Sequence, residues 1–435
     1  MPRQRSPHRG VVVLALVGTL SVAGCAATPA DSRPGSAASA PVSTAPVSPA
    51  PTPKASTPTA STSRPATPSP TASPAPGPGR TPPPTEPTEP TCAELAARLS
   101  LDDQVGQLLM VAVSSTGIDD SAAATLADTR AGSALLLGNS DLGLAATRRV
   151  ATDARRAVTG PPGVRGLVAV DQEGGQVQRL RGAGFDDIPT AVAQARLSDP
   201  ELEQAAARWG GQLSDAGIDV DLAPVADVVP MRTAGRNAPI GRLSRGYGSD
   251  PEQVAAKVVA FSSGMRQAGV VTAVKHFPGL GRVRGNTDFA TRVVDSVTTR
   301  EDPRLAGFRA AVRAGVPMVM VSSAIYRRID ADQQAVFSRE VITDMLRGDL
   351  GFDGVVISDD LSAAAVRDLE PGRRAVGFVQ AGGDLAIVGD LSEAATMADA
   401  LSLEAGRDPE LARQVTRSAA RVLALKATQD RADCR

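Results

Sequence analysis

The chain has 435 residues, of which 42% are hydrophobic, and its formal net charge is -1. This length is enough for two average domains or for one large α/β barrel with a sizeable core. The near-neutral balance gives no basic surplus that would indicate a nucleic-acid partner, so none is expected.

Residues 1–24 have the pattern of a bacterial export signal. Three arginines within the first nine residues form a charged region, and an apolar region follows at residues 11–22. The stretch Val22-Ala23-Gly24-Cys25 resembles a lipobox, whose cysteine is lipidated and becomes the mature N-terminus. A short transmembrane anchor is the alternative, but the apolar run is shorter than the ~20 residues that a span needs. We therefore predict that Cys25 anchors the protein to the membrane outside the cytoplasm.

Residues 25–91 are rich in Pro, Ser, Thr and Ala and hold few apolar side chains. A segment of this composition cannot bury enough surface to fold and behaves as a semi-extended tether. We expect it to hold a folded domain away from the membrane, within a cell-wall layer.

The folded domain is predicted to span residues 92–435, where apolar runs typical of strands alternate with helical stretches such as Pro251–Met265 and Pro303–Ala314. Eight apolar runs occur, at residues 108–113, 133–137, 167–170, 218–223, 270–274, 317–321, 354–357 and 384–388. Strands that alternate with helices imply parallel βαβ units, and this number favours a TIM-type (β/α)8 barrel. A doubly wound sheet is the alternative, but no G-x-G-x-x-G motif follows an early strand.

Two cysteines lie at the ends of this domain, Cys92 and Cys434, and no other cysteine follows Cys25. An even pair in an exported protein favours a disulfide, and a closed barrel brings its termini close together. We predict a structural bridge between them; two free thiols are the alternative.

Charged or titratable residues directly follow several of the apolar runs. Asp171 follows one run, Lys275 and His276 follow another, and Asp359 and Asp360 follow a third. Because the carboxyl ends of parallel barrel strands share one face, these groups should converge there. Carboxylates, one ammonium and one imidazole, without a cofactor motif, indicate hydrolysis of a polar neutral substrate with no cofactor.

Each of these residues also has an ordinary structural interpretation. An aspartate at a strand end often caps the next helix, which fits Asp360, and Lys275 and His276 could form a structural ion pair. His276 is the only histidine besides His8 of the leader, so no histidine-based metal site is expected. A Ser-His-Asp triad is not ruled out by the residue counts, although no G-x-S-x-G elbow occurs.

Three ordered motifs resemble those of glycoside hydrolase family 3, and most closely those of bacterial single-domain β-N-acetylglucosaminidases (β-N-acetylhexosaminidases) that act on cell-wall fragments. The motifs are DQEGGQVQR at residues 171–179, KHFPG at residues 275–279 and SDDLS at residues 358–362. The resemblance extends over essentially all of the chain from Cys92 to about Ala427. It implies a (β/α)8 barrel that performs retaining hydrolysis without a cofactor.

The resemblance also implies roles for individual residues. Asp359 would be the nucleophile that forms a glycosyl-enzyme intermediate, with the acid/base group about 5 Å away across the bond. Asp171, Arg245, Lys275 and His276 match positions that bind sugar hydroxyls and hold the ring in a reactive pose.

The loop after KHFPG departs from the family pattern, in which an Asp-Ser-His segment supplies the acid/base histidine. Here Leu280 replaces one histidine, and no Asp-x-His segment occurs in the chain. Asp288 falls at or beside the missing position and is our candidate acid/base. That role requires a pKa raised by burial or by the charge of the nucleophile. Gly281 and Gly285 could act as hinges that let the loop close.

The sequence therefore predicts a monomeric, membrane-anchored exo-β-N-acetylglucosaminidase that acts on small saccharides or muropeptides derived from peptidoglycan. Aromatic residues make up only 3% of the chain, which favours a small exo-type site over a long cleft of stacked sugars. Three alternatives remain open: a β-glucosidase-type specificity, a catalytically impaired saccharide-binding lipoprotein of the same fold, and a transport-system solute-binding lipoprotein with two α/β lobes.

Overall fold

Eight parallel strands form the central sheet of residues 89–435, the part of the chain that the computed structural model describes. They are β1 (Leu109–Ser114), β2 (Ser133–Leu137), β3 (Leu167–Val170), β6 (Val220–Asp221), β7 (Val271–Phe277), β9 (Met318–Val321), β12 (Val355–Ser358) and β13 (Ala386–Val388). Each strand pairs with the next one in this order, β1 also pairs with β13, and a parallel bridge between Ile357 and Leu385 closes the ring. This confirms the predicted (β/α)8 barrel and contradicts the two-lobed alternative. The leader, Cys25 and the linker up to residue 88 lie outside the described residues.

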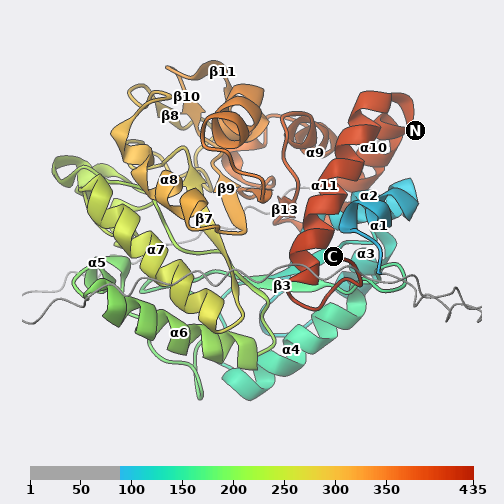
Figure 1. The fold of residues 1–435 in the computed structure, drawn as a ribbon, viewed down its shortest axis with the longest axis horizontal. Helices are drawn as coiled ribbons and strands as arrows, with labels where there is room; N and C mark the ends of the chain where they lie inside the picture. The colour runs from blue at the N-terminus through green and yellow to red at the C-terminus, as the bar shows by residue number, and fades with distance from the viewer. Residues whose placement is uncertain (1–88) are drawn as a thin grey trace, which may run out of the picture. The chain divides into compact units, whose positions relative to one another are not determined.

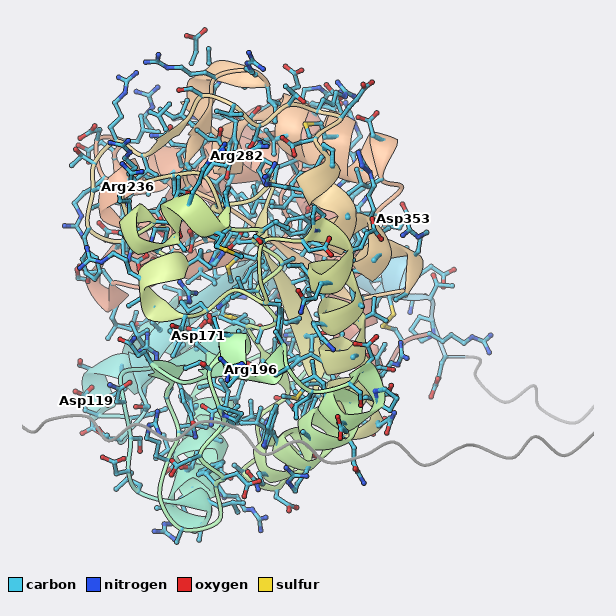
Figure 2. All side chains as sticks on the ribbon, turned by 90° about the vertical axis from the view of Figure 1, so that its left-hand side faces the viewer. Asp119, Asp171, Arg196, Arg236, Arg282 and Asp353 are labelled. Atoms are coloured by element: carbon cyan, nitrogen blue, oxygen red, sulfur yellow. A yellow bond between two sulfur atoms is a disulfide. The ribbon has the colours of Figure 1, made fainter. Side chains whose placement is uncertain are left out.

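Helices surround the strands as an outer layer (Figure 1). They are α1 (Cys92–Arg98), α2 (Leu101–Gln107), α3 (Asp120–Asp128), α4 (Leu144–Ala157), α5 (Ala191–Gln194), α6 (Asp199–Asp215), α7 (Pro251–Gln267), α8 (Ala306–Arg313), the π-helical segment η5 (Glu340–Asp349), α9 (Pro371–Gln380), α10 (Ala394–Arg407) and α11 (Pro409–Ala427). Charged side chains such as Asp119, Arg196 and Asp353 are exposed at the surface (Figure 2). Among the described helices, none is both long and apolar enough to cross a membrane.

Local sequence signals set the helix boundaries. Helix α6 begins with a capping box, in which Ser198 and Glu201 each accept a hydrogen bond from the other's backbone N–H. Helix α7 begins at Pro251 after the capping side chain of Asp250. The helix predicted at 303–314 is divided, because Asp302 caps a short 3-10 turn, η3 (Pro303–Leu305), before α8 begins.

The apolar residues of the strands alternate between two cores. In β1, Met110 and Ala112 point into the barrel with Leu135 and Met320, whereas Val111 and its odd-numbered neighbours pack against the helices. This alternation follows from the period of two in a strand. Both faces are buried, which is why the strands read as continuous apolar runs in the sequence.

Strand β7 is longer than the sequence predicts. The apolar run ends at Val274, but the strand continues through Lys275 and His276 to Phe277. The Lys275 N–H donates to the carbonyl of Pro224, and the Phe277 carbonyl accepts from Ser322. The two polar residues therefore belong to the sheet, where hydrogen bonds on both sides hold them, and do not lie in the following loop.

The amino ends of the strands are covered by the end of α11. The Lys426 ammonium donates to Gln107 Oε1 (2.5 Å) and to the Gly132 carbonyl (2.7 Å), which lie just before β1 and β2. Nearby, Cys92 at the start of α1 and Cys434 after α11 form a disulfide with Cα atoms 4.9 Å apart. This is the pair that the sequence predicts, and it lies at the end of the barrel opposite the strand carboxyl ends.

Candidate active site

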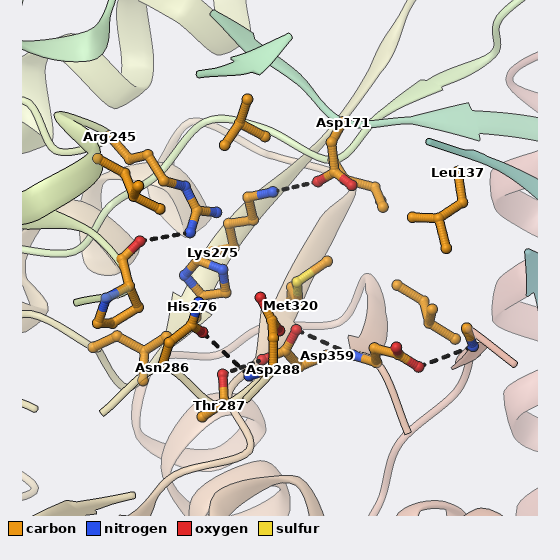
Figure 3. Close-up of a pocket in the computed structure, with 18 of the residues that line it drawn as sticks. Leu137, Asp171, Arg245, Lys275, His276, Asn286, Thr287, Asp288, Met320 and Asp359 are labelled. Atoms are coloured by element: carbon orange, nitrogen blue, oxygen red, sulfur yellow. Dashed lines mark hydrogen bonds and ion pairs between the residues drawn. The ribbon is translucent and has the colours of Figure 1, made fainter. Parts of the chain in front are cut away.

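A cavity of about 340 Å³ opens at the carboxyl ends of the barrel strands, a size within the range of small-molecule sites. Six residues predicted from the sequence line it together: Asp171, Arg245, Lys275, His276, Asp288 and Asp359 (Figure 3). They come from the ends of β3, β7 and β12 and from two loops, so the barrel brings together residues that are far apart in the sequence. Apolar side chains, among them Leu222 and Met320, form part of the wall.

Two cations and two anions form a buried cluster on one side of the cavity. The Lys275 ammonium lies 2.6 Å from Asp171 Oδ1 and 2.7 Å from Glu173 Oε1. Arg245 donates from Nε and Nη2 to the two oxygens of Glu173 (2.8 and 2.7 Å) and from Nη1 to the Pro239 carbonyl (2.8 Å). This bidentate pairing fixes the plane of the guanidinium.

The charges of the cluster stabilise one another. Burial raises the pKa of Glu173, but the neighbouring Arg245 and Lys275 outweigh burial and hold this pKa at about 2. Burial lowers the pKa of Lys275, and the charges of Asp171 and Glu173 reverse this and raise it. Lys275 is therefore an ammonium at neutral pH, and it keeps one of its three N–H groups for a ligand.

Asp227 fixes the orientation of His276. Its Oδ2 accepts from His276 Nδ1 at 2.7 Å, and its Oδ1 accepts from the backbone N–H groups of His276 (3.3 Å) and Leu280 (2.7 Å). Because a carboxylate only accepts hydrogen bonds, Nδ1 carries the hydrogen and Nε2 is left for a ligand. The Lys275–His276 peptide bond is cis.

Asp359 directly follows β12 and lines the cavity near Thr287 and Asp288 (Figure 3). Its Oδ1 accepts from the backbone N–H of Asp360 (3.1 Å), and its Oδ2 accepts from Thr287 Oγ1 (3.5 Å). Burial raises the pKa of Asp359; the nearby His276 acts in the opposite direction, and the charge of Asp288 raises this pKa further.

Asp360 has a structural role that differs from the predicted helix cap. Its Oδ1 accepts from the backbone N–H groups of Ser362 (2.8 Å) and Gly389 (2.9 Å), so it joins the end of β12 to the end of β13. No helix begins at Leu361, and the next helical turn, η6, spans Ala364–Val366. Burial raises the pKa of Asp360 to about 6.

Asp288 lies at the mouth of the cavity on the loop that follows β7. Its side chain is exposed, and its backbone N–H donates to Asn286 Oδ1 (3.1 Å). Leu280, at the start of this loop, is buried and also lines the cavity. Within residues 89–435, no three His, Cys, Asp or Glu side chains are grouped so that they could hold a metal ion.

Comparison with known proteins identifies the family. Residues 100–425 match the glycosyl hydrolase family 3 N terminal domain. The chain belongs to glycosyl hydrolase family 3. This confirms the resemblance indicated by the three sequence motifs.

Several known proteins share substantial identity with the chain. A beta-hexosaminidase of Stenotrophomonas maltophilia (strain K279a) is 37% identical over 232 residues, which are 51% of this chain and 65% of the relative. The crystal structure of a beta-N-acetylhexosaminidase from Beutenbergia cavernae DSM 12333 is 46% identical, with a TM-score of 0.75, and the match covers 76% of this chain and 99% of that one. A family 3 beta-N-acetylglucosaminidase from Paenibacillus sp. str. FPU-7 is 30% identical, with a TM-score of 0.68, over 76% of this chain and 63% of that one.

Sequence reasoning missed three residues that the structure places in contact with the predicted ones: Glu173, Asp227 and Thr287. Glu173 lies inside the first motif but was not singled out, although it holds both cations of the cluster. Asp227 lies six residues after the end of β6, so the strand-end rule that selects Asp171 does not reach it. Thr287 is a neutral residue of the loop, and no sequence signal marked it.

Proposed function

We propose that this family 3 protein is a retaining exo-glycosidase that hydrolyses terminal β-N-acetylglucosaminides. The observation that carries the proposal is the cavity that Asp359 and Asp288 share with the charged cluster of Asp171, Arg245 and Lys275. The names of the relatives, beta-hexosaminidase and beta-N-acetylglucosaminidase, support the choice of sugar.

In the proposed reaction, Asp359 attacks the anomeric carbon and forms a glycosyl ester while the glycosidic C–O bond breaks. Asp288 gives its proton to the departing oxygen, which leaves as an alcohol. Water then attacks the anomeric carbon from the opposite face and displaces the Asp359 carboxylate, while Asp288 takes a proton from the water. Two displacements at the same carbon release the sugar with its original anomeric configuration and restore both carboxyl groups. Lys275, Arg245 and Asp171 bind the hydroxyls and hold the ring during both steps.

The test is hydrolysis of aryl β-N-acetylglucosaminides by wild type, Asp359→Ala and Asp288→Asn. Asp359→Ala should abolish turnover of every substrate. Asp288→Asn should lower kcat/KM about 10²–10⁴-fold for a poor leaving group and much less for dinitrophenolate, which leaves without a proton. Asp353→Asn is the matched control, because this exposed residue lies before β12, at the opposite end of the strand from Asp359. Turnover that survives in Asp359→Ala would contradict the nucleophile assignment.

A second candidate is a saccharide-binding protein with impaired catalysis. It is favoured by the exposed position of Asp288 and by the absence of the family's loop histidine from the chain. Calorimetric binding of N-acetylglucosamine by a wild type that turns over no aryl glycoside would support it. A parallel assay with aryl β-glucosides tests the β-glucosidase-type specificity.

We also propose that the protein is a monomeric lipoprotein that acts outside the cytoplasm on peptidoglycan fragments. The lipobox at Cys25 and the Cys92–Cys434 disulfide support an exported protein. Cys25→Ala should move the protein from the membrane fraction to the soluble fraction and abolish labelling with a radioactive fatty acid. Membrane retention of this variant would contradict the anchor.

A further inference from the structure

One aromatic side chain of this molecule stands apart from all the others. The sequence holds eight Phe, two Tyr and one Trp, all within the described residues. All are buried except Phe185, which is half-buried, and Phe289, which is 84% exposed. Phe289 is also the only aromatic residue that lines the cavity among residues 89–435. In a chain so poor in aromatics, the single fully exposed ring lies at the mouth of the active site.

The loop holds Phe289 in this place through backbone hydrogen bonds. Its N–H donates to the Asn286 carbonyl (3.1 Å), which closes a tight turn. Thr287, two residues before Phe289, is buried, and its carbonyl accepts from the Ala365 N–H (3.0 Å) on the segment that follows β12. The backbone next to Phe289 is therefore tied to η6, the helical turn that follows β12 and Asp359.

We propose that Phe289 is the platform for the leaving group, and that its ring stacks against the apolar C–H face of a second sugar ring. This inference rests on the proposed function. The proton donor must reach the oxygen that joins the first sugar to the leaving group, so the residue after Asp288 borders the leaving group. An aromatic face buries apolar surface of a sugar while the sugar's hydroxyls remain in water at the open mouth. The preferred substrate is thus a disaccharide whose second ring lies outside the cavity.

The decisive experiment compares two substrates that differ only in the leaving group. A β-linked N-acetylglucosamine disaccharide offers a ring to Phe289, whereas β-N-acetylglucosaminyl fluoride offers none; aryl glycosides are unsuitable because an aryl group can stack as well. Phe289→Ala should lower the ratio of the two kcat/KM values about tenfold, as expected for a loss of about 1.4 kcal/mol of stacking. Phe289→Tyr should keep the ratio. Leu403→Ala, which removes an exposed apolar side chain of α10, should not change it.

An unchanged ratio in Phe289→Ala, or an equal loss with both substrates, would overturn the proposal, since equal losses would mean that the ring only supports the loop. If wild type hydrolyses neither substrate, the proposed function fails, and the platform is then judged by calorimetry. In the Asp359→Asn background, Phe289→Ala should lower the ratio of the binding affinity for the disaccharide to that for N-acetylglucosamine about tenfold. An affinity ratio that is the same with and without the Phe289 ring would contradict the platform, whether or not the protein is catalytically active.

Discussion

Lys275 lies among more carboxyl groups than its charge can balance. Together, Lys275 and Arg245 neutralise Asp171 and Glu173. A fifth group, Asp221 of β6, is fully buried beside them. Its Oδ1 accepts from the Gln172 N–H (2.9 Å), while its Oδ2 has no hydrogen-bond partner among residues 89–435. A third negative charge would have no counterion. Burial, helped by the charges of Asp171 and Glu173, therefore raises the pKa of Asp221 to about 8.

The neutral state of Asp221 predicts a characteristic dependence of stability on pH. In the unfolded chain this carboxyl ionises near its ordinary pKa of 3.8, and in the folded protein near 8. Between these values the folded state binds more protons, so the contribution of Asp221 to the free energy of unfolding falls as pH rises. Asp221→Asn should remove this fall, and the variant should gain stability relative to wild type between pH 5 and pH 8 by on the order of 3–4 kcal/mol. Chemical denaturation of both proteins at pH 5 and pH 8 measures this difference in the free energy of unfolding.

A suitable control is Asp295→Asn. This residue is also buried, but its carboxylate accepts hydrogen bonds from the N–H groups of Val297 and Thr298. Asp295→Asn should lower the free energy of unfolding at pH 8, whereas Asp221→Asn should raise it. A constant stability difference between Asp221→Asn and wild type at both pH values would refute a neutral Asp221.

At the residue scale, the sequence predicts which positions reach the site but not how they pair. Asp171, Lys275 and Asp359 follow apolar runs, and the common face of a parallel barrel is enough to place them together. The partners Glu173 and Asp227 depend on how β3, β6 and β7 align and on the paths of their loops. That alignment arises from long-range packing, which no local pattern in the sequence records.

At the scale of elements, the loop that carries Asp288 and Phe289 is firmly attached at its base. Asn237 Nδ2 donates to the carbonyls of Leu280 (2.7 Å) and Val283 (2.8 Å). At Gly281, a Cβ atom would lie 2.0 Å from the Val228 carbonyl oxygen. Gly281 therefore allows two backbone segments to approach closely. This packing role differs from the hinge role that the sequence suggests for Gly281.

Gly281→Ala should push the loop away from Val228 and so displace Asp288 from Asp359. We expect a loss of about 1–3 kcal/mol of stability, typical of overpacking, and at least a tenfold lower kcat/KM for an aryl glycoside. The matched control is Gly211→Ala in the middle of α6, where a Cβ atom would meet nothing within 4 Å. It should stabilise the protein by up to about 1 kcal/mol, because alanine favours the helix. Wild-type kinetics in Gly281→Ala would show that the close contact does not position the loop.

Strand and helix types could be predicted well because apolar runs and capping residues are local signals. The predicted end of β7 was wrong, since polar Lys275 and His276 continue the strand. A polar residue is a poor marker of a strand end when its side chain faces a cavity that contains counter-charges. β7 therefore extends further than its apolar run, whereas β3 ends with its run at Val170.

At the scale of the whole molecule, the barrel separates its two ends by role. The cavity lies at the carboxyl ends of the strands, and the termini of the domain meet at the amino ends, where Ala432 pairs with Val164 just before β3. The backbone N–H of Cys92 donates to the Arg435 carbonyl (3.2 Å), beside the disulfide. The bridge spans 342 residues of sequence, so it constrains nearly the whole folded domain when that domain unfolds.

The disulfide should therefore contribute to stability without affecting the chemistry. A cross-link that closes so long a loop reduces the entropy of the unfolded chain, and its removal typically costs about 2–5 kcal/mol. We expect the Cys92→Ser, Cys434→Ser double variant to lose stability in this range while kcat/KM at temperatures below its melting transition stays at the wild-type value, because the site lies at the other end of the barrel. Reductant should shift the melting temperature of wild type toward that of the double variant and leave the variant unchanged. A reductant effect of equal size on both proteins would place the stabilising bond elsewhere.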